Sequence, residues 1–304
     1  MSFCLQILGS GSAVAQYGRN HTSHALIINS KVFLIDCGEG TQIQLSKFRV
    51  KKERIAAIFI SHLHGDHYLG LMGLLSSMHL LGRTKTLLLV SPPGLSDIIT
   101  IQLKYSNTVL NYKIDHVEVS GDNKQIVFED KYITVRTFPL NHRIPTVGFR
   151  FDEKPKQRRI NKEKLPNDIK LQDIAKLKTG QNITDHSGNV IYNNELTLPP
   201  RKSRSYAFCS DTKYDPSLID FIQNVNLLYH EATFLEVHQP IAEKTFHSTA
   251  KQAASIANQG LVGELIIGHF SARYKDISMF SDEAKSVFNK TFLAKEGDIY
   301  CIDD

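Results

Sequence analysis

Short apolar runs separated by turns make up most of the first 150 residues. Runs of this length, bounded by glycine, proline or polar clusters, are typical of buried strands. The pattern predicts strands over residues 3–9, 25–28, 32–36, 56–60, 86–90 and 133–138. A longer apolar run over residues 69–81 predicts a buried helix.

The chain returns to this kind of pattern after about residue 196. Strands are predicted over residues 205–208, 227–229 and 265–267. An alanine-rich helix is predicted over residues 248–259, with Ser248 as its N-cap and Gly260 as its stop. Strands that alternate with helices indicate the α/β class, in which helices cover layered sheets. We expect one domain over residues 1–304.

Residues 151–196 break the pattern, because polar and charged residues dominate and apolar periodicity is weak. This segment predicts an inserted basic arm rather than part of the core. Between Arg150 and Gly180 there are 10 Lys and Arg against 5 Asp and Glu, a local excess equal to the +5 net charge of the whole chain. A local basic patch suits a polyanionic partner. On composition alone, a solvated surface loop is the simpler interpretation.

Composition and cysteine usage narrow the class of protein. No apolar stretch is long enough to cross a bilayer, and no basic-then-apolar leader follows Met1. The four cysteines, Cys4, Cys37, Cys209 and Cys301, form no C-x-x-C pair, which argues against a cysteine metal site. We therefore expect a soluble cytoplasmic protein without membrane association, whose cysteines are reduced and buried.

The strongest chemical signal is the segment 61–67, Ser-His-Leu-His-Gly-Asp-His, directly after a predicted buried strand. Imidazole nitrogens and carboxylate oxygens are ligands that suit zinc. His62 and His64 are spaced to hold one ion, and Asp66 and His67 lie further along the turn, where they could face a second. A histidine-rich surface loop that binds metal by accident is the alternative.

Three other predicted strands also end at an imidazole or a carboxylate. His142 follows the strand over 133–138, Asp211 follows that over 205–208, and His269 follows that over 265–267. A metal site at one edge of a layered sheet would need this arrangement, which the accidental loop does not explain.

The H-x-H-x-D-H run resembles the signature of the metallo-β-lactamase superfamily, whose fold is an αββα sandwich. The resemblance implies two Zn²⁺ ions per chain. It implies that the first ion is held by His62, His64 and His142, the second by Asp66, His67 and His269, and that Asp211 bridges both. Asp36, in the Asp-Cys-Gly-Glu-Gly turn, matches an aspartate that supports the ligands.

Further segments resemble the ribonuclease Z family, over the whole chain. They are the Gly-Ser-Gly-Ser-Ala opening at 9–13 with Arg-Asn at 19–20, His-Glu-Ala-Thr at 230–233, Phe-His-Ser-Thr at 246–249, and His-Phe-Ser-Ala-Arg-Tyr at 269–274. The Pro-Arg-Lys-Ser-Arg run at 200–204 resembles that family's P-x-K-x-R loop. The resemblance implies an endoribonuclease that removes the 3′ trailer from precursor tRNA, leaving a 3′-hydroxyl on the tRNA and a 5′-phosphate on the trailer. It also implies a homodimer.

The same resemblance assigns roles to individual residues. Asp66 would orient the attacking water, and His247 would protonate the leaving oxygen while Glu231 holds its ring. Singly, Glu231 could merely end a strand and His247 could merely begin a helix. Contacts to RNA are expected from the following cations: Lys202, Arg204 and Arg273 near the cut, and Lys154, Lys156, Arg158 and Arg159 in the arm.

One departure concerns the arm, which lacks the family's usual Gly-Pro tip between residues 154 and 180. The alternative functions are another hydrolase of the same fold that acts on a small phosphodiester or thioester, and a non-catalytic RNA-binding subunit. The first would not need the arm, and the second would not need the full ligand set.

Overall fold

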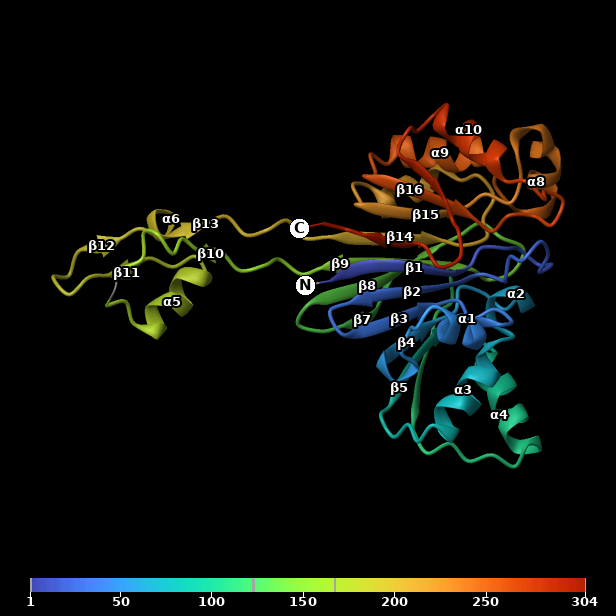
Figure 1. The fold of residues 1–304 in the computed structure, drawn as a ribbon, viewed down its shortest axis with the longest axis horizontal. Coiled ribbons are helices and arrows are strands. Elements are labelled where there is room, and N and C mark those ends of the chain that lie inside the picture. The colour runs from blue at the N-terminus through green and yellow to red at the C-terminus, as the bar shows by residue number, and fades with distance from the viewer. Residues whose placement is uncertain (1, 122–123, 167, 304) are drawn as a thin grey trace.

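The computed structural model describes residues 2–121, 124–166 and 168–303. Two seven-stranded sheets pack face to face, and helices cover the outer face of each (Figure 1). The αββα sandwich is therefore confirmed. None of the helices in these described ranges is long and apolar enough to span a bilayer.

The first sheet is built from the N-terminal half, closed at one edge by the C-terminal strand. Its order is β18 (Ile299–Cys301), β1 (Phe3–Gly9), β2 (Ser23–Ile28), β3 (Lys31–Ile35), β4 (Ile55–Phe59), β5 (Leu87–Ser91) and β6 (Ile114–Glu118). Its outer face carries α1 (Thr41–Lys47), α2 (Gly65–Tyr68), α3 (Leu71–Leu80) and α4 (Leu95–Tyr105), with the short η1 (Lys52–Arg54) before β4.

The second sheet joins three antiparallel strands to four parallel ones. Its order is β17 (Thr291–Leu293), β16 (Glu264–Gly268), β15 (Leu227–Glu231), β14 (Ser205–Cys209), β9 (Val147–Glu153), β8 (Ile133–Pro139) and β7 (Gln125–Glu129). Its outer face carries η2 (Pro216–Leu218), α7 (Ile219–Ile222), η3 (Glu236–His238), α8 (Gln239–Thr245), α9 (Ala250–Gln259) and α10 (Ser278–Lys285).

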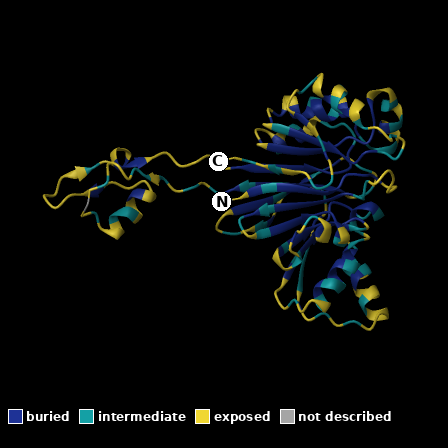
Figure 2. Cartoon of the chain, in the orientation of Figure 1, coloured by how far each residue is buried: buried dark blue, intermediate teal, exposed yellow. Residues whose placement is uncertain are grey.

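Three apolar layers hold this body together. Aromatic residues such as Phe33, Phe59 and Phe149 fill the space between the two sheets. Their large side chains reach across the gap and bury much apolar surface. The other two layers lie between each sheet and its helices. Buried strands cross the middle of the body and exposed residues line its helical faces (Figure 2).

The inserted segment forms a separate lobe, which two extended stretches of chain without secondary structure connect to the body (Figure 1). It contains β10 (Arg159–Ile160), α5 (Leu171–Lys178), β11 (Ile183–Thr184), β12 (Val190–Ile191), α6 (Asn193–Leu196) and β13 (Thr197–Leu198). A small core of Leu177, Ile183 and Leu196 holds the lobe. The segment runs from residue 154 to 204, since β9 continues to Glu153 and β14 begins at Ser205, so it is longer than the expected 151–196.

Most predicted elements are confirmed within two residues, among them β1, β4, α3 and β16. The predicted N-cap of α9 is wrong: Thr249, not Ser248, caps this helix, in a capping box with Gln252. The side chain of Ser248 instead donates to the carbonyl of Thr212.

The expectation that all four cysteines are reduced is wrong for two of them. Cys37 and Cys209 are free and buried, but Cys4 and Cys301 form a disulfide. The two lie directly opposite each other on the antiparallel strands β1 and β18. The bond joins residues 297 positions apart and so ties the C-terminal edge strand to the N-terminal strand.

Thiol titration of the denatured, unreduced protein should therefore count two thiols rather than four. Cys301→Ser should leave three, since Cys4 loses its partner, and should lower the midpoint of urea unfolding under non-reducing conditions because the long closed loop is opened. Four thiols in the unreduced protein would contradict the disulfide.

Candidate metal centre

Five strands deliver polar side chains to one edge of the sandwich. β4 leads into His62, His64, Asp66 and His67, and β8 leads into His142. The parallel neighbours β14, β15 and β16 lead into Asp211, Glu231 and His269, because the carboxyl ends of parallel strands share one edge of the sheet.

The first pocket is formed by His62, His64, His142 and Asp211, whose ligand atoms lie within 4.8 Å of one another. Nε2 of His62 and Nε2 of His142 lie 3.0 and 3.2 Å from Nδ1 of His64. Nitrogens around a tetrahedral zinc ion with bonds of about 2.05 Å would lie about 3.3 Å apart. The spacing therefore fits a ligand cage.

The second pocket is formed by Asp66, His67 and His269. Nε2 of His67 and Nε2 of His269 lie 3.3 Å apart, and each lies 3.3 Å from Oδ2 of Asp66. Asp211 stands between the pockets: its Oδ2 lies 3.6 Å from Nε2 of His62, and its Oδ1 lies 3.2 Å from Nε2 of His269. One carboxylate thus faces both groups.

In most of these histidines, the ring nitrogen that does not face a pocket has a hydrogen-bond partner in the protein. Nδ1 of His67 lies 2.7 Å from Oδ2 of Asp36, and Nδ1 of His142 lies 2.9 Å from the carbonyl oxygen of Phe246. Each Nδ1–H can then donate to an oxygen, which leaves Nε2 free as a ligand. Asp36 therefore does support the ligands, through His67.

Burial and mutual charge set the protonation of the cluster. Burial alone would raise the pKa of Asp211, but His269, His67 and His62 hold it well below its usual value. Burial lowers the pKa of His62 well below its usual value. Burial alone would lower the pKa of His67. The carboxylates of Asp211, Asp66 and Asp36 outweigh burial, Asp211 most strongly, and raise this pKa well above its usual value. The imidazoles thus favour the ionised form of the central carboxylate.

Glu231 and His247 form a pair beside the pockets. Nδ1 of His247 lies 2.9 Å from Oε1 of Glu231. The backbone N–H groups of Thr212, Thr233 and Ser248 also donate to this carboxylate. Burial lowers the pKa of His247, but the Glu231 carboxylate outweighs it and raises that pKa to about 9. The Glu231 carboxylate therefore favours the protonated form of the His247 ring.

The backbone is bent sharply at several of these residues. Asp36 and His269 have φ of 55° and 63°, and Phe246 has φ of 60°, in the left-handed region that non-glycine residues seldom adopt. Gly38 is needed for a different reason, since a Cβ there would come 2.4 Å from the carbonyl oxygen of Asp66. The supporting turn and the ligand loop thus pack backbone to backbone.

An open cleft of about 640 Å³ lies over the pockets and is lined by His64, Asp66, Asp211, His247 and His269. Arg143 and Arg273 also line it.

Sequence reasoning missed Arg143, which directly follows the ligand His142. Burial lowers the pKa of His64, and the nearby Arg143 charge acts in the same direction. The guanidinium groups of Arg143 and Arg273 make no hydrogen bond or ion pair with the described part of the chain. Both are therefore available to a phosphate.

The predicted RNA contact at Arg204 is wrong. Its side chain is buried, donates to both oxygens of Glu153 at 2.6 and 2.9 Å, and donates to the carbonyl of Ile302 at 3.1 Å. It precedes β14, whereas Asp211 follows it, and at about 3.3 Å per strand residue the two lie roughly 20 Å apart. Arg204 therefore joins the base of the arm to the body. Lys202 is exposed at the same end, away from the pockets.

The other predicted cations lie along the arm or its base. Lys154 pairs with Glu129 at 2.9 Å, and Lys156 pairs with Glu153 at 3.0 Å. Within the lobe, Arg158 donates to Thr197, and Arg159 donates to the carbonyl of Pro199. None of these four reaches the pockets; a role in RNA binding would be at a distance from the cut.

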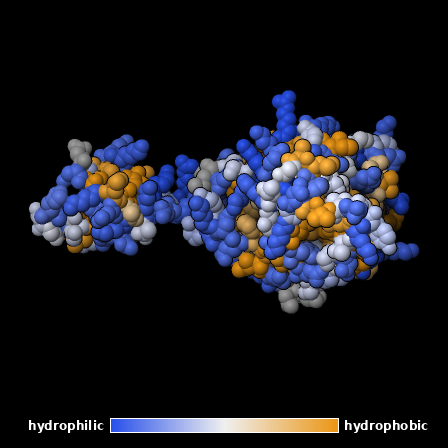
Figure 3. Space-filling model, turned by 90° about the horizontal axis from the view of Figure 1, so that it is seen from below, coloured by the Kyte–Doolittle hydropathy of each residue, from blue (hydrophilic) through white to orange (hydrophobic). Residues whose placement is uncertain are grey.

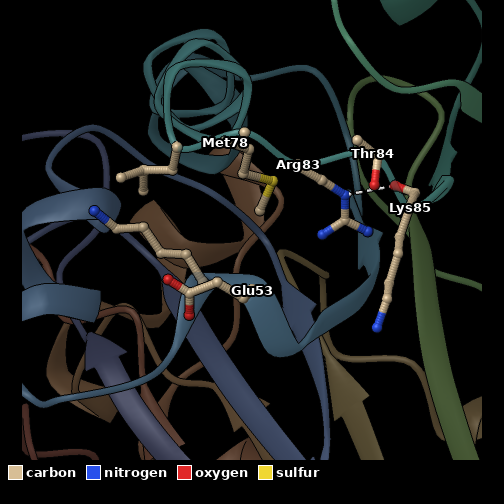
Figure 4. A pocket seen from close by; sticks show the side chains of 8 residues that line it. Glu53, Met78, Arg83, Thr84 and Lys85 are labelled. Carbon is tan, nitrogen blue, oxygen red and sulfur yellow. Dashed lines mark hydrogen bonds between the residues drawn. The ribbon is translucent and has the colours of Figure 1, made fainter.

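A smaller hollow of about 180 Å³ lies between η1 and the end of α3 (Figure 4), and none of the candidate metal ligands lines it. Its arginine, Arg83, donates to the carbonyls of Ile55, Lys85 and Thr86 at 3.0, 2.8 and 3.1 Å. This guanidinium holds the chain and is not aimed at a ligand, so the metal cleft remains the candidate site.

Comparison with known sequences gives two kinds of match. A ribonuclease Z of Cytophaga hutchinsonii is 47% identical over 305 residues, covering 100% of this chain and 97% of the relative. A ribonuclease Z of Bacteroides fragilis is 45% identical over 295 residues, covering 97% of each. A family model described as anti-Pycsar protein Apyc1 matches residues 3–155, which stop short of Asp211, Glu231, His247 and His269.

Comparison with solved structures agrees. Human tRNase Z, short form, superposes with a TM-score of 0.71 at 26% identity, covering 98% of both chains. The metallo-β-lactamase fold protein YhfI from Bacillus subtilis superposes with a TM-score of 0.70 at 17% identity, covering 99% of both, which concerns the fold alone. The family and the fold therefore support a metal cofactor held by His and Asp side chains.

Asp211→Asn should weaken metal binding at both pockets, because that carboxylate faces both, whereas His64→Ala should weaken the first pocket only. Titration of the metal-stripped protein with Zn²⁺ against a chromophoric chelator measures the two affinities. We expect about a 10–100-fold loss in both steps for the first variant and in one step for the second. A single-step loss in Asp211→Asn would contradict the bridging position.

Proposed function

The chain belongs to the ribonuclease Z family, and through residues 3–155 also to that of the anti-Pycsar protein Apyc1, and we infer that it is an endoribonuclease that processes the 3′ end of precursor tRNA. Sequence identity of 47% to a named ribonuclease Z, along the whole chain, supports this substrate. The observation that carries the chemistry is the Glu231–His247 pair, at 2.9 Å, beside the groups of His and Asp side chains that could hold metal.

We propose that the metal is zinc, with two ions per chain. Six of the seven expected ligand side chains expose less than a tenth of their surface, and imidazole with carboxylate is a donor set that zinc favours. Asp211 Oδ1 is a buried oxygen without a hydrogen-bond partner in the described chain, as expected of an atom meant for a cation. Zinc bound there would lower the pKa of water and neutralise charge on a phosphate.

Three side chains then have separate roles in the reaction. Oδ2 of Asp66 faces His67 and His269, and we assign its other oxygen to orienting the attacking water. Nδ1 of His247 is held by Glu231, so Nε2 is the nitrogen that can carry a proton to the leaving oxygen. Glu231 fixes the tautomer and keeps the ring charged.

Water as the nucleophile determines the product ends. Metal-free ribonucleases use the 2′-hydroxyl of the substrate and leave a cyclic phosphate, which this site does not require. If His247 protonates the 3′-oxygen of the tRNA, the phosphate stays with the trailer. We therefore propose a 3′-hydroxyl on the tRNA and a 5′-phosphate on the trailer.

Contacts to the substrate divide between the cleft and the arm. Arg143 and Arg273 are the cations beside the pockets, and we assign them to phosphates next to the cut. The arm cations Lys154, Lys156, Arg158 and Arg159 would bind the tRNA body through its backbone, adding affinity without reading sequence.

We also propose that the chain forms a homodimer, as the family resemblance implies. The face that carries α3 and α4 exposes Leu80, Ile101, Tyr105 and Val109, each more than half accessible. Viewed from below, apolar side chains show on this face of the body and on the lobe (Figure 3). Partial cover by a second copy would remove this apolar area from water.

Incubation with a precursor tRNA that carries a 3′ trailer, with the cut mapped to one nucleotide, tests the function. The tRNA should end in a 3′-hydroxyl, and a precursor with a single 2′-deoxy nucleotide at the cut site should still be hydrolysed. A 2′,3′-cyclic phosphate, or full resistance of the deoxy substrate despite normal binding, would contradict the proposed chemistry.

Removal of the lobe, residues 158–200, with a short Gly-Ser linker and with Lys156 and Arg204 kept on Glu153, should weaken precursor binding far more than hydrolysis of a nitrophenyl phosphodiester. Binding by the intact protein should fall steeply with salt, by about 0.7–0.9 in the log–log slope per phosphate contact. Arg143→Ala is the matched contrast, since a cation beside His64 should matter to both substrates. Equal loss of both activities in the arm deletion would mean that the arm is structural.

A further inference from the structure

The hydroxyl of Thr233 lies between the second metal pocket and the Glu231–His247 pair. Thr233 is buried just beyond the end of β15. Its Oγ1 lies 2.8 Å from Oε2 of Glu231, 2.8 Å from Nδ1 of His269 and 3.2 Å from Nδ1 of His247. One side chain thus touches a metal-pocket ligand and both members of the pair.

The direction of the first bond follows from what Glu231 can accept. This carboxylate receives the backbone N–H groups of Thr212, Thr233 and Ser248 at 3.2, 2.8 and 3.0 Å. A site that supplies only donors suits the ionised form, which has no proton to give. The single hydroxyl proton of Thr233 is therefore donated to Oε2 of Glu231.

The direction of the second bond follows from the orientation of His269. Nε2 of this ring faces the pocket, 3.3 Å from Oδ2 of Asp66 and 3.2 Å from Oδ1 of Asp211. If Nε2 ligates a metal ion, Nδ1 would carry the hydrogen and would donate it to a lone pair of Thr233 Oγ1, 2.8 Å away. Nδ1 of His247 lies closer to Oε1 of Glu231, at 2.9 Å, and donates there.

We propose that Thr233 is a positioning residue whose hydroxyl links the second metal pocket to the proton donor. It accepts from His269 and donates to Glu231, so that the ring of a metal ligand and the carboxylate that orients His247 are fixed by the same oxygen. The inference rests on the proposed function for its catalytic part, but its effect on metal binding needs no RNA.

The alternative is that Thr233 only fills space at the end of a strand. A pair of substitutions separates the two. Thr233→Val keeps the β-branched shape and the backbone N–H bond to Glu231 but loses the hydroxyl, whereas Thr233→Ser keeps the hydroxyl and loses the methyl group. Thr137→Val is the matched control, because Thr137 is equally buried, in β8, and its hydroxyl makes only a 3.4 Å bond to the carbonyl of Gln125.

The first measurement is zinc affinity of the metal-stripped proteins by chelator competition. Thr233→Val should weaken one of the two binding steps about 10–100-fold, the usual effect of losing a partner of a ligating histidine. Thr233→Ser should bind within about threefold of the wild-type protein, and Thr137→Val should match it.

The second measurement is turnover at saturating zinc. Thr233→Val should lower kcat on precursor tRNA about 10–100-fold with KM nearly unchanged, and should lower it much less on a nitrophenyl phosphodiester, whose leaving group needs no proton. Thr233→Ser should restore most of the loss.

Wild-type zinc affinity and kcat in Thr233→Val would overturn the inference, and so would a Thr233→Ser variant as impaired as Thr233→Val, because the hydroxyl would then be irrelevant. Failure of the wild-type enzyme to cut precursor tRNA would refute the proposed function instead, and the zinc affinities would still decide the role of Thr233.

Discussion

A carboxylate buried at the centre of the site constrains the rest of this structure. Asp211 is almost completely removed from water, and an isolated buried carboxylate would be destabilising by several kcal/mol. His62, His67 and His269 approach its two oxygens from both sides. Without metal, His67 is the imidazole placed to balance this charge, and the carboxylates around it raise its pKa well above the usual value. Bound cations would do so without that protonation, so metal affinity and folding are coupled here.

The sandwich meets this constraint by bringing strand ends together. The parallel order β14, β15, β16 places Asp211, Glu231 and His269 side by side although 58 positions separate the first from the last in sequence. The other sheet supplies the loop after β4, and the N–H of Val147 donates to the carbonyl of Ser61 at 3.0 Å, joining the two sheets beside the ligands. The left-handed backbone at Asp36 and His269 is strain that this packing holds in place.

The sequence predicts the parts of this arrangement that are local. The segment 61–67 carries four ligand side chains in a short loop, and apolar runs predict the strands that lead to His142, Asp211 and His269. Long-range pairings leave no such local pattern. The opposition of Cys4 and Cys301 depends on β18 lying beside β1, and the burial of Arg204 depends on Glu153 and on the chain end at Ile302. Arg143 could have been suspected as the residue after a ligand, but only the fold shows that its guanidinium faces the cleft.

The separation of the arm from the metal cleft bears on the size of the substrate. The cations at the arm's base lie roughly 20 Å from Asp211 by strand length, and the lobe lies further out still (Figure 1). A small phosphodiester in the cleft cannot reach them, so their charge lowers the free energy only of a polyanion long enough to span both. In the proposed function, an extended RNA would gain affinity along the arm, whereas bond cleavage would depend on the strand ends around Asp211. A substrate fixed at two such distant points presents one phosphate to the pockets, so the cut can be placed by shape and length rather than by base sequence.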